Sequence, residues 1–320
     1  MDTLSHLALG VVVAHTCAGK RNRGIAPLLY GAAAAQVPDL DVLLTPFTDS
    51  LGALLSHRAL SHSLLLWLTL PPLLTLASTT LHRDTSFSWK RRFVIISAAW
   101  LSHLIVDLFN TYGTAYLYPF SLHRFAIDAL PILTLSLLLV LSALAIGIGI
   151  SRIRRGYAPA WLGWSGIALV ALYLTTAVAA KTTIETQLSS RFANMPLYTS
   201  PMPISIARWH FVADAGNHYI VGRCNPLGQQ TTVIAELPKN HHLLTPIANY
   251  PKIEDIQRFT KGWFNLQSNT NGLLHLHDLR FSSLATSFPD AYVLTFSIKP
   301  TPSAPIIERS KLRRHIGPWF

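Results

Sequence analysis

The chain has 320 residues, of which 50% are hydrophobic and only 13% are charged. Together with a positive mean hydropathy of +0.34, this composition indicates a membrane protein and excludes a chain that is soluble throughout. The net charge of +11 does not indicate nucleic-acid binding, because about half of the Lys and Arg residues lie in short loops between apolar segments, where they report topology.

Apolar segments fill the first 180 residues and predict an α-helical, polytopic membrane domain of about six spans, over residues 1–182. They cover residues 4–18, 25–44, 63–81, 93–110, 127–150 and 160–180. A span needs about 20 apolar residues, so we expect the first segment to be tilted, partial or re-entrant. Adjacent prolines, Pro71 and Pro72, should kink or break the third segment.

Basic residues alternate between the loops that join these segments. The first, third and fifth loops are basic, with Lys20, Arg21 and Arg23, then Arg83, Lys90, Arg91 and Arg92, then Arg152, Arg154 and Arg155. The second and fourth loops hold one arginine each. By the positive-inside rule the odd loops are cytoplasmic, so both termini are predicted to be extracytoplasmic.

Residues 186–320 have the pattern of a soluble domain, which this topology places outside the membrane. Period-two alternation predicts strands at 204–212, 218–223, 231–237, 272–281 and 291–298, with a helical segment near 253–263. An α+β domain that is mostly antiparallel β is therefore expected. His275 and His277 share one strand face, which is either a second metal site or a solvated surface.

The predicted topology places the candidate metal ligands on the outer side of the membrane. These ligands are His6, Asp39, Asp41, His57, His62, His103 and Asp107. Structural histidines would have no reason to gather in this way. His15 lies near the opposite side and is expected to be structural.

His103 and Asp107 are central to this hypothesis, because ionisable side chains inside a span are costly and face the bundle interior. Their spacing of four places both on one helix face. The pair is either half of a metal site or a buried hydrogen bond that joins two spans.

Imidazole and carboxylate ligands without a thiol suit zinc first, then manganese or iron, as one or two ions. Asp39 and Asp41 point to the same side only in an extended segment, so we expect the second span to end near Pro38. The carboxylate that is not a ligand, Asp39 or Asp41, would be the general base. Arg58 could hold a phosphate or an oxyanion, or could simply be solvated.

Two further residues, His123 and Asp128, allow two interpretations each, a role in the site or a structural role. His123 is either a ligand or an interfacial anchor beside Arg124. Asp128 opens the fifth apolar segment, so it could serve the site or could cap the helix.

Five short motifs occur in a fixed order: MDTLSH at residues 1–6, PDLD at 38–41, HRALSHS at 57–63, SHLIVD at 102–107 and TYGT at 111–114. This set resembles the YdjM-like family of bacterial inner-membrane proteins. The resemblance covers residues 1–135 well and the C-terminal domain loosely. The resemblance implies metal-dependent hydrolysis, and phospholipids are a suggested substrate of the family. The site residues that it implies are His6, Asp39, Asp41, His57, Arg58, His62, His103 and Asp107. Some members are connected to LexA, the DNA-damage repressor.

The sequence departs from the family pattern at two places. Ala59-Leu60 stands where a glycine would follow the arginine, and Asp128-Ala129 stands where Asp-Pro is usual. The first departure weakens the argument for a tight turn but removes no ligand.

The resulting hypothesis is a metal-dependent hydrolase of the bacterial cytoplasmic membrane, acting on a phosphoester or phospholipid at the outer face. Membrane lipids are the expected partners. A metal or proton transporter is one alternative, since His and Asp inside spans suit it equally. The other is a membrane anchor for an outer partner-binding domain.

Overall fold

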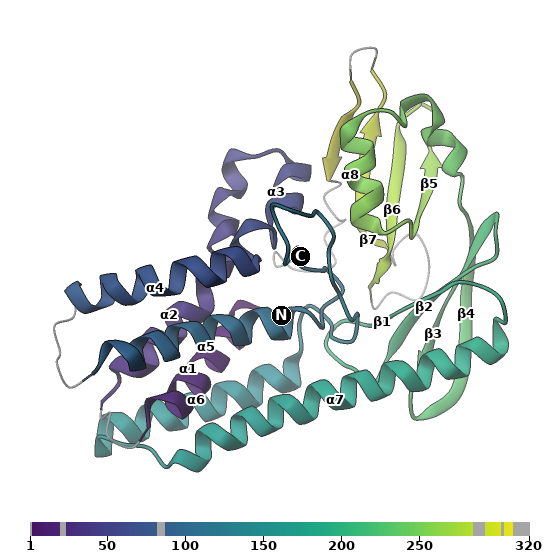
Figure 1. Ribbon diagram of the computed structural model, residues 1–320. Coiled ribbons are helices and arrows are strands. Elements are labelled where there is room, and N and C mark those ends of the chain that lie inside the picture. Colours follow the sequence, from purple (N-terminus) through teal and green to yellow (C-terminus); the bar gives the residue numbers. More distant parts are fainter. Residues whose placement is uncertain (1, 20–23, 82–86, 284–291, 302–303, 310–320) are drawn as a thin grey trace. The chain divides into compact units, whose positions relative to one another are not determined.

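The structure is a computed structural model that describes residues 2–19, 24–81, 87–283, 292–301 and 304–309. The chain forms two compact units. The first consists of Met1–Leu43 and Ser56–Val178, and the second of Leu44–Leu55 and Ala179–Phe320. Figure 1 shows helices in the first unit and sheets in the second.

Six long or medium helices build the first unit: α1 (Thr3–Ala18), α2 (Ala26–Gln36), α4 (Leu64–Leu81), α5 (Trp89–Asp107), α6 (Leu135–Arg155) and the first part of α7 (Ala160–Arg191). Between α2 and α4 the chain forms a 3-10 helix η1 (Pro38–Phe47), a short helix α3 (Ser50–Ser56) and a 3-10 turn η2 (Leu60–His62). Asp2 caps α1 by accepting a hydrogen bond from the Ser5 amide at 2.9 Å.

The prediction of about six membrane spans is not supported, although a helix occurs in each predicted segment. Among the described residues, two helices, α6 and α7, are long and apolar enough to cross a membrane. A third span results if Ser50–His62 and Leu64–Thr80, bent by 60°, count as one. Helix α1 has 16 residues and α2 only 11, so both are short of the ~20 that a span needs.

Two further helices, α4 and α6, differ from the sequence prediction. Helix α4 continues through Pro71 and Pro72 instead of breaking there. Helix α6 begins at Leu135 rather than near 127, because residues 128–134 are irregular.

Asp128 therefore caps no helix; it lies in this irregular stretch with a positive φ of 56°. His123 is exposed, and its ring packs edge-on against Phe125.

Two glycines allow α1 and α2 to approach closely. A Cβ on Gly10 would lie 2.4 Å from the Gly31 carbonyl oxygen, and a Cβ on Gly31 would lie 2.3 Å from the Cβ of Ala14. Contacts of this kind between small residues are typical of helices packed in membranes. Both helices also pack against α5, so the three helices form one core.

His15 is a structural residue at the far end of α1, as predicted. Its Nε2 lies 3.0 Å from the Pro159 carbonyl oxygen, and its Nδ1 lies 3.0 Å from Nη2 of Arg152. Arg152 also donates to the Gly24 carbonyl at 3.0 Å. These bonds join the connection after α1 to the connection after α6. The basic residues Lys20, Arg21, Arg23 and Arg83 lie outside the described residues.

Two antiparallel four-stranded sheets form the second unit, each in sequential strand order. The first contains β1 (Leu197–Pro201), β2 (Trp209–Asp214), β3 (His218–Asn225) and β4 (Gly228–Pro238). The second contains β5 (Phe264–Ser268), β6 (Leu274–Ser282), β7 (Tyr292–Lys299) and β8 (Ile306–Arg309), with α8 (Pro251–Thr260) before it. The predicted mostly antiparallel β domain is confirmed.

His275 and His277 lie on β6, and both face hydroxyls of β7. Nδ1 of His277 lies 2.8 Å from Thr295 Oγ1, and Nδ1 of His275 lies 3.2 Å from Ser297 Oγ. Within the described part of the chain they do not gather with a third metal-ligating side chain. The arrangement favours a structural role.

We expect His210 to make the second unit sensitive to acid. It is buried on β2 and donates to the Leu279 carbonyl at 2.8 Å, and burial lowers its pKa to about 4. An unfolded histidine titrates near pH 6.5, so the unfolded chain binds the proton first as the pH falls. Stability is therefore fully present above about pH 6.5 and declines towards pH 4, by roughly 3 kcal/mol for this residue.

The measurement is chemical unfolding followed by tryptophan fluorescence between pH 7 and pH 4. His210→Gln should show a shallower loss of stability over this range than wild type. His242→Gln removes an exposed histidine of the same unit and should follow wild type. Identical slopes for all three proteins would contradict the prediction.

Candidate metal centre

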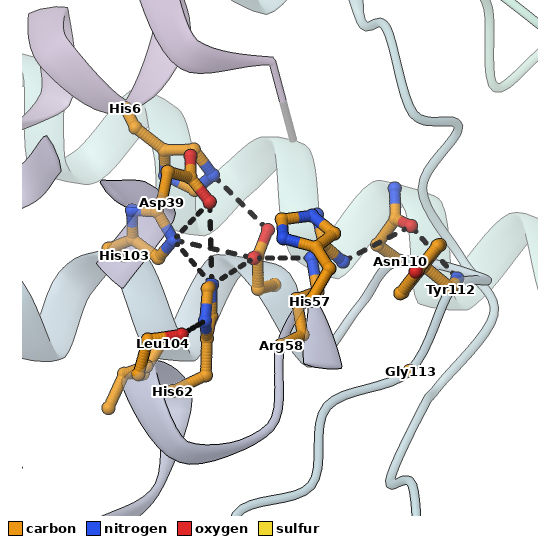
Figure 2. Close-up of polar contacts among 12 residues, drawn as sticks. His6, Asp39, His57, Arg58, His62, His103, Leu104, Asn110, Tyr112 and Gly113 are labelled. Atoms are coloured by element: carbon orange, nitrogen blue, oxygen red, sulfur yellow. Dashed lines mark hydrogen bonds and ion pairs between the residues drawn. The ribbon is translucent and has the colours of Figure 1, made fainter. Parts of the chain in front are cut away.

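Three segments of the first unit bring the polar side chains of the site together. Helix α2 ends at Gln36, and η1 then turns Asp39 into the core. His62 is the last residue of η2, and α5 supplies His103 and Asp107 from its last two turns. Figure 2 shows the side chains of Asp39, His62 and His103 facing one another.

Four of these residues form a compact group of donor atoms: Asp39, His62, His103 and Asp107. The two Nε2 atoms of the histidines are 3.1 Å apart. Asp39 Oδ1 lies 3.5 Å from Nε2 of His62 and 3.6 Å from Nε2 of His103. Asp107 Oδ2 lies 3.5 Å and 3.4 Å from the same two atoms. The group is a candidate metal-binding site.

These separations fit a metal ion. With metal–ligand distances of about 2.0–2.2 Å, the ligand atoms of a tetrahedral site lie about 3.3–3.6 Å apart. Five of the six separations in the group are 3.1–3.6 Å. The sixth, between the two carboxylates, is at most 4.8 Å. Only small adjustments would place these atoms, or three of them and a water molecule, around one ion.

Hydrogen bonds to the other ring nitrogens fix both histidines in the tautomer that a metal requires. Nδ1 of His103 lies 2.7 Å from the Ala35 carbonyl oxygen, which can only accept, so this nitrogen carries the proton. Nδ1 of His62 lies 2.9 Å from Ser61 Oγ, whose own proton goes to Asp41 Oδ2 at 2.6 Å. Ser61 therefore accepts from His62, and in the neutral form of both rings the two Nε2 atoms are free to bind a metal ion.

Two ring nitrogens at this distance need a positive charge between them, either a proton on one ring or a metal ion bound to both. The carboxylates of Asp39 and Asp107 add negative charge at the same point. His62, His103 and Asp107 have fully buried side chains, and that of Asp39 is 14% exposed. Because solvent cannot screen the three buried groups, the arrangement favours a bound cation strongly.

Arg58 and His6 surround the carboxylate of Asp107. Nε of Arg58 lies 3.1 Å from Oδ2, and Nε2 of His6 lies 3.2 Å from Oδ1. The ring of His6 stacks on that of His103 with centroids 3.6 Å apart. Arg58 also donates to Asn110 Oδ1 at 3.4 Å. These contacts hold Asp107 in one orientation.

The turn that carries Arg58 requires a left-handed residue, with φ at 59°. Its amide donates to Asp41 Oδ2 at 3.1 Å, and its carbonyl accepts from the Ala115 amide at 3.0 Å. The residue with the strained, left-handed backbone is therefore Arg58 itself and not Ala59, which follows it. Strain of this kind persists only where the surroundings fix it.

The sequence-predicted site residues divide into an inner and an outer group. The four inner residues, with donor atoms in contact distance, are Asp39, His62, His103 and Asp107. The outer residues, which contact this group or its supports, are His6, Asp41, His57 and Arg58. His57 lies 2.8 Å from Asp41 through Nδ1 and does not reach the donor group.

The sequence analysis did not identify two supporting residues, Ser61 and Asn110. Ser61 lies directly before His62 in the HRALSHS motif, and its position between a histidine and a carboxylate required the folded turn. Asn110 follows Asp107 by three residues, a spacing that continues the helix face and could have revealed it.

The model of the YdjM inner membrane protein family matches residues 1–184. The chain belongs to this family. The match includes the complete donor group and ends before β1. No curated protein and no solved structure matches the chain. For this YdjM family member, the family name and the apolar helices therefore establish a membrane protein, and the reaction has to be argued from the site.

Ser61→Ala should weaken metal binding without removing a ligand. The hydroxyl holds the His62 ring in place, and loss of such a support usually costs about 10–100-fold in affinity. Zinc affinity measured by competition with a chromophoric chelator would test this. Ser136→Ala, on α6 outside the donor group, is the control and should bind as wild type does. Equal affinity in the two variants would contradict the role of Ser61.

Proposed function

We propose that this YdjM family member is a membrane-embedded metal-dependent hydrolase that acts on a phosphoester, with phospholipids as the first substrate class. The observation that carries the proposal is the distance of 3.1 Å between Nε2 of His62 and Nε2 of His103, beside two carboxylates. Zinc is the first candidate ion, with manganese or iron as alternatives.

His62, His103 and Asp107 would hold the ion, since all three are buried and each is fixed by another group. A bound divalent ion would supply a Lewis acid and would lower the pKa of a water molecule towards neutrality. A catalytic site keeps one coordination position open. Three protein ligands leave that position free.

Asp39 is suited to be the general base. Its carboxylate borders the donor group, yet its side chain is 14% exposed, so it can reach both a water molecule and solvent. Asp41, the other candidate, already accepts from Ser61 and from the Arg58 amide and lies 2.8 Å from His57. These contacts favour Asp41 as the residue that orients His62.

Arg58 is better suited to position Asp107 than to bind phosphate. Its side chain is 5% exposed, and it lies 3.1 Å from the carboxylate. Its guanidinium also stands 5.3 Å from the centre of the Tyr112 ring. Removing it would leave the buried Asp107 charge poorly compensated, which is strongly destabilising.

Exposed aliphatic side chains beside Asp39 support a lipid substrate. Leu40, Val42 and Leu43 follow it on η1, and each is about half exposed or more. Leu60 on η2 is also exposed. In a membrane protein such a surface around a polar site faces acyl chains or headgroups, so a lipid phosphoester would meet the site directly.

The test compares phosphate-ester and phospholipid hydrolysis by wild type and Asp39→Asn, each loaded in turn with zinc, manganese or iron(II). Loss of a general base costs about 10²–10⁴-fold in rate, so Asp39→Asn should be at least that much slower at unchanged metal content. Asp49→Asn, an exposed carboxylate in the neighbouring segment, is the control. Equal rates for Asp39→Asn and wild type would overturn the assignment of the base. A metal-loaded wild type without hydrolysis would overturn the proposed function.

A further inference from the structure

A groove of about 900 Å³ lies between α4 and α5, away from the donor group. One wall comes from α4 and the other from the first turns of α5. The lining residues are Pro72, Thr75, Leu76 and Thr79 on α4, and Trp89, Lys90, Phe93 and Val94 on α5. His103 lies nine residues or more beyond this wall of α5, so the groove and the metal centre occupy opposite ends of the helix.

The two ends of the groove differ in chemistry. Lys90 and Trp89 lie at the start of α5, next to the end of α4 that carries Thr79. The other end is apolar, with Pro72, Leu76 and Val94. Lysine and tryptophan are typical of the headgroup level of a membrane, whereas the apolar end suits hydrocarbon.

The threonine hydroxyls do not make the groove polar, because backbone carbonyls satisfy them. Thr75 donates to the Pro71 carbonyl at 2.8 Å, and Thr79 donates to the Leu76 carbonyl at 2.7 Å. Lys90 is then the charged group of the lining, and it is exposed. The neighbouring Arg92 is buried and directed inward, where it donates to the Ser78 carbonyl at 2.6 Å.

We propose that this groove binds one anionic phospholipid, with its acyl chain between α4 and α5 and its phosphate at Lys90. A peptide would leave backbone groups unpaired along the apolar wall, whereas an acyl chain has none to pair. At a membrane surface a basic residue such as Lys90 attracts the headgroup of an anionic lipid. The proposal is independent of the hydrolase activity, because it concerns the other end of α5.

The experiment uses the purified full chain in nanodiscs that contain a photoactivatable phosphatidylglycerol or phosphatidylcholine with the reactive group on the acyl chain. After irradiation, mass spectrometry locates the label. Wild type should be labelled mainly in peptides of α4 and α5 that line the groove. Phosphatidylglycerol should exceed phosphatidylcholine there about fivefold, as one basic residue predicts.

Two kinds of variant test the two ends separately. Val94→Trp and Leu76→Trp fill the groove from opposite walls, and both side chains are exposed, so both should fold and should lose most of the groove label. Lys90→Gln should keep the label but lose the preference for phosphatidylglycerol. Leu139→Trp and Arg154→Gln, exposed on α6, are the matched controls and should behave as wild type.

Label spread evenly over the helices, or unchanged by both tryptophan variants, would overturn the proposal. An equal yield with both lipids in wild type would overturn the role of Lys90. Light scattering provides a further check, because a dimer whose groove residues are protected from label would show that a second copy occupies the groove.

Discussion

His103→Ala protein should be purified with less than about a tenth of the divalent metal that wild type carries, since even outer supports of a site are worth 10–100-fold in affinity. His103 contributes Nε2 to the donor group, and its Nδ1 bond to Ala35 directs that atom. The substitution removes one of the three proposed ligands and leaves His62 and Asp107, which are too few for tight binding. Elemental analysis of the detergent-purified protein is the measurement.

His123→Ala is the matched control, because it removes an exposed imidazole from the same unit and should keep full metal content. The expected order is wild type equal to His123→Ala and far above His103→Ala. Stoichiometric metal in all three proteins would show that the ion is bound elsewhere. If folded wild type took up no zinc, manganese or iron(II), the contact between His62 and His103 would be structural and would not belong to a metal site.

Gly31→Val should prevent the first unit from folding. A Cβ at this position would lie 2.3 Å from the Cβ of Ala14 and 2.4 Å from the Gly10 carbonyl oxygen, so α1 and α2 would have to separate. Overpacking of this kind costs about 3 kcal/mol or more. Separation would also move Ala35 away from His103. Size-exclusion chromatography of the detergent extract should show aggregate in place of a monodisperse peak.

Gly147→Val is the corresponding control on α6. A Cβ on Gly147 meets no atom within 4 Å, so valine should be accommodated at nearly full yield. Both substitutions change helix propensity in the same direction, slightly in favour of the helix, and only the close contact differs. If the two variants gave equal yields of monodisperse protein, the α1–α2 contact would not be a determinant of the fold.

Local spacing predicted part of the site and could not predict the rest. His103 and Asp107 are one helical turn apart, so their shared face followed from the sequence. Asp39 and Asp41 were expected to act together in an extended segment. They lie instead on a 3-10 helix, whose three residues per turn direct them apart. Asp39 joins the donor group, whereas Asp41 contacts His57 and Ser61.

Apolar composition identified the helical segments but not their length. Residues 25–44 are nearly continuous in hydrophobicity, yet α2 ends at Gln36 and a proline follows at position 38. Hydropathy alone does not show this break, because the exposed leucines of η1 count equally; the argument from Asp39 and Asp41 did predict an end near Pro38, and α2 confirms it. In the second unit, alternation located β2, β3, β4, β6 and β7, while β1, β5 and β8, with five residues or fewer each, gave no clear pattern.

The bond from His103 to the last turn of α2 has a consequence for assembly. The donor group draws on η1, η2 and α5, and through Ala35 it also fixes α2, so an ion there would cross-link segments separated by more than 60 residues of chain. Ligand that binds only the native state adds stability in proportion to the logarithm of its free concentration. The folded protein should therefore persist longer when more metal is available in its compartment. The amount of folded protein in the cell should then rise and fall with the free metal concentration.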